Sequence, residues 1–298
     1  MEYIIETNEL TKQYPGKLAV DHINMHIKKG DIYGFIGMNG AGKTTAMKMI
    51  LGLTKVTSGS IKIYGSEDLK AGRRKIGSLI EAPGLYLNAS AYENLKRCSY
   101  LYGGTEEEIR EILKYVGLEN TGNRLVSAFS LGMTQRLGIA IALLGNPEIL
   151  VLDEPINGLD PEGILEIRNT LIRLNKEKGI TILISSHLID ELAKITTVYG
   201  IIRNGQLVEE ISSKELMEKC NKNILIRVDD VDRTLEILHE NNFLGAHEVL
   251  RELNSIRLYS HYDESNLIIE CLVKAGIKVY ELSIGGDLEQ FFIERMGR

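Results

Sequence analysis

The residues best suited to chemistry begin with a glycine-rich loop, Gly37 to Thr44, that follows the apolar run Ile32 to Ile36. The loop fits the pattern G-x-x-x-x-G-K-[ST] of a phosphate-binding loop. Its glycines let successive backbone N–H groups face one anion, Lys43 is expected to bridge the β- and γ-phosphates, and the Thr44 hydroxyl is expected to ligate Mg²⁺. The alternative is a glycine-rich turn that binds no ligand. The Lys-Thr-Thr sequence counts against that alternative. The predicted nucleotide contacts are Asn39, Gly40, Ala41, Gly42, Lys43, Thr44 and Thr45.

Two adjacent carboxylates, Asp153 and Glu154, end a second apolar run, Ile149 to Leu152. An isolated Asp-Glu pair at a strand end usually solvates a loop or caps a helix. The phosphate loop upstream favours a functional interpretation, in which Asp153 holds the water shell of Mg²⁺ and Glu154 orients and deprotonates the attacking water. Positioning and charge neutralisation do most of the work in phosphoryl transfer, so an acid beside a metal-bound triphosphate makes physical sense.

Between these two features, Ser130 and Gly132 open a helix within the stretch Phe129 to Arg136. A hydroxyl group and a backbone N–H at a helix N-terminus both suit anionic oxygens. The simpler interpretation makes Ser130 an ordinary N-cap of the helix that runs to Leu144, and both interpretations can hold at once.

In the order and content of these motifs, residues 2 to 215 resemble the ATP-binding subunits of ABC transporters. The resemblance implies that Ser130 and Gly132 contact the γ-phosphate held by the phosphate loop of a partner subunit. It also implies that His187 is the switch histidine, which contacts the γ-phosphate and aligns the general base Glu154. A lone His after a strand is more often structural, and its position relative to Glu154 favours the functional role.

Two more positions match the family's nucleotide contacts. Tyr14 matches the aromatic residue that stacks on adenine, with a core tyrosine as the alternative. Asp160 ends the stretch Asn157 to Asp160, which resembles the loop that joins the two subunits. Asp160 is also a good N-cap for the helix that follows.

The chain departs from the family's usual pattern in two places. The usual signature Ser-Gly-Gly-Gln is Ser-Leu-Gly-Met at residues 130–133, and Glu81 stands where a glutamine is usual. Together with Pro83 to Tyr86 and Tyr92 to Leu95, these departures resemble the bacitracin-resistance and lantibiotic self-protection group, whose members carry glutamate at this place. Glutamate adds charge at the metal and cannot donate a hydrogen bond when ionised. We expect Glu81 to contact the metal, with a surface loop acid as the alternative.

The elements that must position these residues alternate between strand and helix. The helix after Asp160 is well specified, because Asp160 suits the N-cap, Pro161 suits the first helical position and Gly179 suits the end. The alternation implies a mainly parallel sheet with helices against it. Strands are expected at residues 32–36, 60–64, 76–80, 149–152 and 180–185, and helices at residues 44–51, 91–101, 106–116, after 161 and at 188–193.

A boundary is expected near Cys220. Beyond it the order of elements is β-α-β-β-α-β, a split βαβ pattern with a strand at 247–253 and a helix capped by Asp263. We predict an α/β P-loop NTPase fold of the ABC ATPase kind, with antiparallel β and helical subdomains, plus a small α+β ferredoxin-like domain. The ATP-binding domain is expected at 1–220, with its helical subdomain at about 88–146, and the accessory domain at 221–298.

Composition excludes several classes of protein. A formal net charge of −6 argues against a protein dominated by contacts to a nucleic-acid backbone, and no nucleic-acid partner is expected. Three widely spaced cysteines form neither a disulfide framework nor a metal-ligand pattern, which favours the reducing cytoplasm. The first residues do not resemble a signal peptide, and the apolar stretch Leu137 to Leu144 is far shorter than the ~20 residues that cross a bilayer. Another subunit is expected to supply any membrane-spanning part.

The predicted function is the ATP-hydrolysing subunit of an exporter, with ATP and Mg²⁺ as cofactors. Two copies, or this chain with a paired ATPase subunit, would sandwich two ATP molecules and drive a separate integral-membrane permease from the inner face of the cell membrane. The predicted substrate is a peptide antibiotic or similar amphiphile, as in antibiotic resistance or self-immunity. The C-terminal domain is expected to regulate the dimer or stabilise it.

The alternatives are an exporter of another drug or lipid-like substrate, a member acting on ribosomes or DNA, and a regulatory switch that binds ATP without turnover. The chain has one cassette and no coiled-coil insertion, which favours a role in transport over a role on ribosomes or DNA. Glu154 and His187 are both present, which counts against a switch without turnover.

Overall fold

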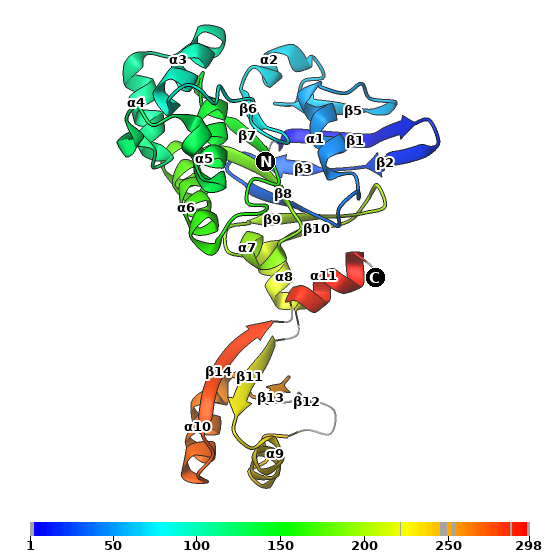
Figure 1. The fold of residues 1–298 in the computed structure, drawn as a ribbon. Helices are drawn as coiled ribbons and strands as arrows, with labels where there is room; N and C mark the ends of the chain where they lie inside the picture. Colours follow the sequence, from blue (N-terminus) through cyan, green and yellow to red (C-terminus); the bar gives the residue numbers. More distant parts are fainter. Residues whose placement is uncertain (1–2, 221, 245–248, 252–253, 287, 297–298) are drawn as a thin grey trace. The chain divides into compact units, whose positions relative to one another are not determined.

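The computed structural model describes residues 3–296 apart from 221, 245–248, 252–253 and 287. The chain divides into two compact units, Met1–Ser213 with Phe292–Arg298, and Lys214–Phe291. The last helix, α11 (Leu288–Met296), carries residues of both units (Figure 1). The domain limits 1–220 and 221–298 stay a prediction from the sequence.

The first unit is built on a six-stranded sheet with the strand order β10-β9-β4-β8-β7-β6. Neighbouring strands are parallel except for β10, which is antiparallel to β9, and every residue of β4, β7 and β8 is buried. Runs of branched apolar residues favour strands covered on both faces, so the predicted mainly parallel sheet is confirmed. The strands are β4 Ile32–Ile36, β6 Ile76–Leu79, β7 Ile149–Asp153, β8 Thr181–Ser186, β9 Val198–Arg203 and β10 Gln206–Ser212.

A second, antiparallel sheet lies beside the first, with β1 paired to β2, β3 and β5 (Figure 1). The predicted antiparallel subdomain is therefore confirmed. Apolar side chains of both sheets and of α1 pack into one core, which includes Ile5, Met47 and Leu183. The elements are β1 Tyr3–Tyr14, β2 Lys17–Ile23, β3 His26–Lys28, β5 Ser58–Ile63, α1 Lys43–Leu51 and α2 Leu69–Arg73.

Helices α3, α4 and α5 contact one another and form the helical part of the first unit (Figure 1). Ser90 and Thr105 begin α3 and α4 with capping boxes, in which each hydroxyl accepts from the N3 backbone N–H and the N3 glutamate accepts from the cap. Asp160 accepts from the Gly163 N–H at 3.1 Å and Gly179 closes α6, as the sequence predicts. The helices are α3 Ala91–Tyr102, α4 Glu106–Tyr115, α5 Leu131–Ala142, α6 Pro161–Lys178 and α7 Ile189–Ala193.

The second unit has the predicted β-α-β-β-α-β order, with an antiparallel sheet in the order β12-β13-β11-β14. Its core joins the sheet to α9 and α10 through residues such as Ile226, Leu238 and Leu272. The strand predicted at 247–253 is observed at 249–251, and its other residues lie outside the described ones. The elements are α8 Ser213–Lys219, β11 Lys222–Val228, α9 Val231–Glu240, β12 Val249–Arg251, β13 Ser255–Leu258, α10 Ser265–Lys274 and β14 Val279–Gly286.

Asp263 does not cap α10, contrary to the sequence-based expectation. It lies inside a 3-10 turn, Tyr262–Glu264, and the following helix starts at Ser265 without a side-chain cap. His261 before the turn has a φ of 58°, so the backbone enters the helix from a left-handed residue that the spacing of apolar positions does not reveal.

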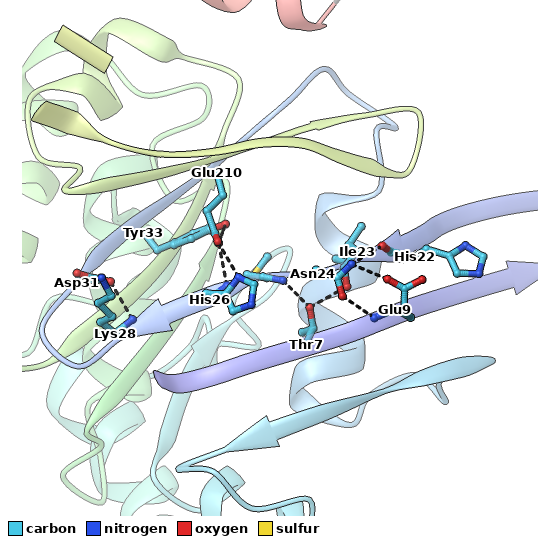
Figure 2. Close-up of polar contacts among 11 residues, drawn as sticks. Thr7, Glu9, His22, Ile23, Asn24, His26, Lys28, Asp31, Tyr33 and Glu210 are labelled. Atoms are coloured by element: carbon cyan, nitrogen blue, oxygen red, sulfur yellow. Dashed lines mark hydrogen bonds and ion pairs between the residues drawn. The ribbon is translucent and has the colours of Figure 1, made fainter. Parts of the chain in front are cut away.

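Glu210 on β10 connects the six-stranded sheet to the antiparallel one, as Figure 2 shows. Its Oε1 accepts hydrogen bonds from the Tyr33 hydroxyl and the His26 backbone N–H, both at 2.8 Å, and its Oε2 lies 2.9 Å from His26 Nδ1. Burial, with the charge of Glu210, raises the pKa of Tyr33 well above its usual value, so the hydroxyl remains a donor. Glycine at position 200 is required, because a Cβ there would lie 2.1 Å from the Tyr33 hydroxyl oxygen.

Tyr33→Phe should lower the free energy of unfolding of the ATPase unit by about 2 kcal/mol, the usual range for a buried hydrogen bond to a charged group. Thermal unfolding of the full chain measures the effect. Tyr100→Phe is the matched control, since Tyr100 is 78% exposed and its change should leave the melting temperature unaltered. Equal melting temperatures for Tyr33→Phe and the parent chain would contradict this role of the Tyr33–Glu210 contact.

Candidate active site

The site lies where the parallel strands β4, β7 and β8 end. Asp153 on β7 is in register with Ser185 on β8, and Phe35 on β4 is in register with the same Ser185. Parallel strands in register bring their carboxyl ends to one edge of the sheet. The residues that follow these strands, including Glu154 and His187, therefore emerge together.

Close backbone approach explains two glycines of the phosphate loop. A Cβ at Gly37 would lie 2.5 Å from the Ile202 carbonyl oxygen, and a Cβ at Gly42 would lie 2.5 Å from the Ala19 carbonyl oxygen. Gly42 also has a φ of 114°, which side chains strongly disfavour. The loop can keep this shape, and aim α1 at an anion, only with glycine at both positions.

Lys43, the first residue of α1, is only 5% exposed and its ammonium group lies inside the loop. Nζ donates to the Gly37 carbonyl at 2.6 Å and to the Met38 carbonyl at 3.3 Å, and it lies 3.1 Å from Glu154 Oε1. A buried ammonium needs such partners because its desolvation is costly. The charge is thus placed where phosphate oxygens can replace the present partners.

Asp153 is 6% exposed and both of its carboxylate oxygens are engaged. Thr44 donates to Oδ2 at 2.7 Å, and Ser185 donates to Oδ1 at 2.6 Å. Ser185 Oγ also accepts from the Glu154 backbone N–H at 2.9 Å. One buried hydroxyl thereby fixes the carboxylate of Asp153 and the backbone of the residue after it.

Glu154 lies between a lysine and a histidine. Its Oε1 pairs with Lys43, and its Oε2 lies 2.9 Å from His187 Nδ1. The backbone φ of Glu154 is 49°, a strained conformation for a residue with a side chain. The bond from the Glu154 N–H to Ser185 Oγ helps to hold this conformation.

A hollow of about 180 Å³ opens at this edge. Six of the seven nucleotide contacts predicted in the loop line it together with Glu154, and Lys17 and Ala19 from the antiparallel sheet complete the wall. These six residues are Asn39, Gly40, Gly42, Lys43, Thr44 and Thr45. The seventh, Ala41, is outside the lining and is buried, with 7% exposure.

The donor set fits a triphosphate with Mg²⁺. The Thr44 hydroxyl and the Asp153 carboxylate, 2.7 Å apart, are the hard oxygen ligands that Mg²⁺ takes, and phosphate oxygens and water would complete its shell. Among the described residues no group of three or more His, Cys, Asp or Glu side chains could hold a metal ion. A metal here would depend on the nucleotide for part of its coordination.

Asp153 and His187 are outside the lining of this hollow but contact Thr44 and Glu154, which are part of it. The other predicted residues outside the lining are Tyr14, Ser130, Gly132, Asp160 and Glu81. Tyr14 ends β1 with 39% exposure, paired with Lys17 across the strands, so it is not a core tyrosine. Ser130 caps α5 by accepting from the Met133 N–H at 3.3 Å, and its own surface is exposed. Gly132 lies in the first turn of the same helix, and Asp160 caps α6.

Glu81 forms an ion pair with Lys48, which is not one of the predicted metal ligands. Its Oε1 lies 2.5 Å from Lys48 Nζ on α1, its side chain is 67% exposed, and its φ is 62°. The structure thus pairs Glu81 with a cation that sequence reasoning missed. Lys48 follows Thr44 by one helical turn, which is the signal that could have suggested it.

Ser185 is the other residue that sequence reasoning missed. The signal was present, because Ser185 and Ser186 are polar residues at the end of an otherwise apolar strand. Both are fully buried, and a buried hydroxyl needs a partner. Only the pairing of β7 with β8 identifies Asp153 as that partner.

Comparison with known sequences shows the family of the chain. The ABC transporter family profile matches residues 20–157. The bacitracin transport ATP-binding protein BcrA of Bacillus licheniformis is 43% identical, with the alignment covering 100% of this chain and 98% of that protein. The lantibiotic transport ATP-binding protein SrtF of Streptococcus pyogenes is 45% identical, covering 74% of this chain and 98% of that protein.

Solved structures agree. The structure of cbiO1 from Clostridium perfringens, part of the ABC transporter complex cbiONQ, is 31% identical with a TM-score of 0.67, covering 74% of this chain and 92% of that one. The dimeric post-hydrolysis structure of the ATP-binding cassette MJ0796, bound to ADP and Pi, is 28% identical with a TM-score of 0.63, covering 70% of this chain and 98% of that one. This chain belongs to the ATP-hydrolysing, ATP-binding subunits of ABC transporters.

Proposed function

We propose that two copies of this chain close around two ATP·Mg²⁺ and drive a separate permease that exports a peptide antibiotic or similar amphiphile. The proposal rests on a divided site, in which the residues predicted to contact one nucleotide lie in two separate places on the chain. Lys43 and Glu154 line one hollow and His187 contacts Glu154, whereas Ser130 caps a helix outside the lining of that hollow. A chain arranged in this way needs a second subunit to bring a Ser130 turn to each nucleotide.

The residues in and beside the hollow support hydrolysis of a bound triphosphate. Lys43 and the loop N–H groups would bind the phosphates, and Thr44 and Asp153 would hold Mg²⁺, which when bound would neutralise phosphate charge. Glu154 takes the proton of the attacking water. His187, at 2.9 Å from Glu154, orients that carboxylate.

The dimer proposal rests on the exposed N-terminus of α5. The first N–H groups of a helix have no partner within the helix, and Ser130 adds a hydroxyl to them. The Ser130 hydroxyl oxygen accepts from the Met133 N–H at 3.3 Å. The Ser130 hydroxyl proton and the N–H of Gly132 thus suit the γ-phosphate held by the other copy.

Family members act with a membrane permease, and the loop after Glu81 suits such a contact. Tyr86 and Leu87 in this loop are 51% and 58% exposed. No helix in the described part of the chain is long and apolar enough to cross a membrane. We place the chain in the cytoplasm, at the inner face of the cell membrane through its permease. The names of BcrA and SrtF, for bacitracin and lantibiotic transport, support a peptide antibiotic as substrate.

Glu154→Gln should retain ATP binding, lower turnover by at least about 100-fold, and make an ATP-dependent dimer accumulate, since an amide cannot accept the proton of water. Turnover is measured by phosphate release, and the dimer by sedimentation with and without ATP. Normal turnover would remove Glu154 as the base.

Ser130→Ala in the Glu154→Gln background tests the second half of the divided site. We expect the ATP-dependent dimer to disappear. Ser90→Ala is the matched control, because Ser90 is also an N-cap, bonded to Glu93 N at 3.2 Å. Both changes cost about 1 kcal/mol of cap stability, but only the first should alter the dimer. A dimer that survives Ser130→Ala unchanged would contradict the proposed contact.

Ser185→Ala should reduce ATPase turnover by about 10-fold or more, as loss of a partner behind a metal ligand usually does, and should raise the Mg²⁺ concentration needed for half-maximal rate. Thr181→Ala is the control. Thr181 is equally buried on the same strand, but its hydroxyl accepts from Gly30 N at the other end of β8. If the two variants have the same turnover per folded protein, Ser185 is structural only.

Glu81→Gln should support hydrolysis and alter its coupling to transport, because it removes the charge that pairs with Lys48. ATPase rate and substrate export are measured with the chain reconstituted beside its permease. Lys48→Met breaks the same pair while keeping the Glu81 carboxylate, so it separates loss of the pair from loss of the acid. Export unchanged from the parent chain would reduce Glu81 to a loop acid.

A further inference from the structure

Lys17 is a charged residue in the wall of the hollow and takes no part in the contacts around Glu154. It follows the turn at Gly16, its side chain is exposed, and it lines the hollow together with Asn39 and Lys43. Lys43 is paired with Glu154, whereas the described part of the chain gives Lys17 neither an ion pair nor a side-chain hydrogen bond. Among the described lining residues, the ammonium group of Lys17 is therefore the uncompensated charge.

A β-bulge in β2 lies beside the hollow. In the pairing of β2 with β1, Ala19 is the extra residue between Leu18 and Val20. Bulges interrupt the regular alternation of side chains and often re-aim a residue next to an active site. A Cβ at Gly42 would lie 2.5 Å from the Ala19 carbonyl oxygen, so β2 runs directly against the phosphate loop. Lys17, two residues before Ala19, therefore reaches the hollow from the strand that touches the loop.

Lys17 and Glu154 enter the hollow from opposite sides of β4. In the six-stranded sheet, β9 is next to β4 on one side, whereas β8 and then β7 lie on the other side. Strand β2 is joined to the β9 side, because the Asp21 N–H donates to the carbonyl of Gly205, in the turn between β9 and β10, at 2.8 Å. Glu154 follows β7. The phosphate loop, which leaves β4, thus lies between Lys17 and Glu154.

The order of the phosphates follows from the position of the general base. Glu154 is proposed to activate the water that attacks the γ-phosphorus, so the γ-phosphate must lie on the β7 side of the loop. The β- and α-phosphates then extend across the loop toward β2. Tyr14, the partner of Lys17 in the pairing of β1 with β2, is the residue expected to stack on adenine. Lys17 is thus located between the adenine and the loop, next to the phosphate that is bonded to the ribose.

We propose that Lys17 is a further nucleotide-binding residue, which contacts the α-phosphate of ATP or ADP. A lysine ammonium is a compact charge with three donors on a flexible stem, so it can reach a phosphate oxygen without a fixed geometry. The assignment rests on the nucleotide site proposed above and adds to it a residue from outside the phosphate loop. Because ATP and ADP both carry the α-phosphate, Lys17 would strengthen the binding of both by the same factor.

Binding of ATP and ADP to the full-length chain tests this assignment. Isothermal titration calorimetry measures both, with EDTA present so that ATP is not hydrolysed. Lys17→Met should raise the Kd for ATP and the Kd for ADP by the same factor of about 5 to 10, as expected for one partly exposed contact to a charged group. Lys17→Arg keeps the charge and should stay within about twofold of the parent chain. Lys28→Met is the matched control, since it removes an exposed lysine from β3 of the same sheet, outside the lining of the hollow, and should change neither Kd.

Sulfur-substituted ADP distinguishes the α-phosphate from the β-phosphate. Sulfur accepts a hydrogen bond less well than oxygen, so one diastereomer of ADPαS should bind the parent chain more weakly than ADP does. In Lys17→Met this difference between ADPαS and ADP should disappear, because the substituted oxygen no longer has a lysine to lose. ADPβS carries its sulfur on the other phosphate, so its Kd relative to that of ADP should be the same in both chains.

The outcomes separate the role of Lys17 from the nucleotide site itself. Unaltered ADP binding by Lys17→Met, an equal loss in Lys28→Met, or loss of ATP binding with ADP binding intact would overturn the role of Lys17. A sulfur effect that depends on Lys17 only at the β-phosphate would overturn the assignment to the α-phosphate. A parent chain that binds neither nucleotide would instead overturn the nucleotide site on which the assignment rests.

Discussion

The register of β4, β7 and β8 is the constraint on which the rest of the site depends. These strands are buried on both faces, and a slip of one residue would turn every side chain to the other face. Asp153 and Ser185 are partners in that register, and the phosphate loop leaves β4 at the same edge. The positions of Lys43 and Glu154 follow from strand pairing before any ligand contributes.

Each charge at this edge already has a partner in the protein. Lys43 bonds two backbone carbonyls and pairs with Glu154, while Asp153 accepts from Thr44 and Ser185. Since buried charges are costly without partners, a nucleotide must replace these contacts rather than add to them. If phosphate oxygens took the Lys43 ammonium, Oε1 of Glu154 would lose its cation and become available to water. Under the proposed mechanism, one lysine would then link nucleotide binding to activation of the base.

Local chemistry made part of this structure predictable from sequence. The phosphate loop, the Asp160 cap and the end of α6 at Gly179 depend on residues a few positions apart, and all are observed where expected. The β-α-β-β-α-β order of the second unit followed from the spacing of apolar residues together with cap and turn residues. The Ser185–Asp153 bond and the start of α10 did not follow, because one depends on strand pairing and the other on a left-handed residue before a 3-10 turn.

The ion pair of Glu81 and Lys48 explains how a charged residue can stand where the family usually has a neutral one. Lys48 offsets the extra charge at a position one turn beyond Thr44. Both partners are substantially exposed, and such pairs contribute only about 0 to 1 kcal/mol. A contact that weak is exchanged at little cost when a metal ion or a permease approaches. Breaking a buried pair at the same place would cost several kcal/mol, so Glu81 would exchange partners much less readily.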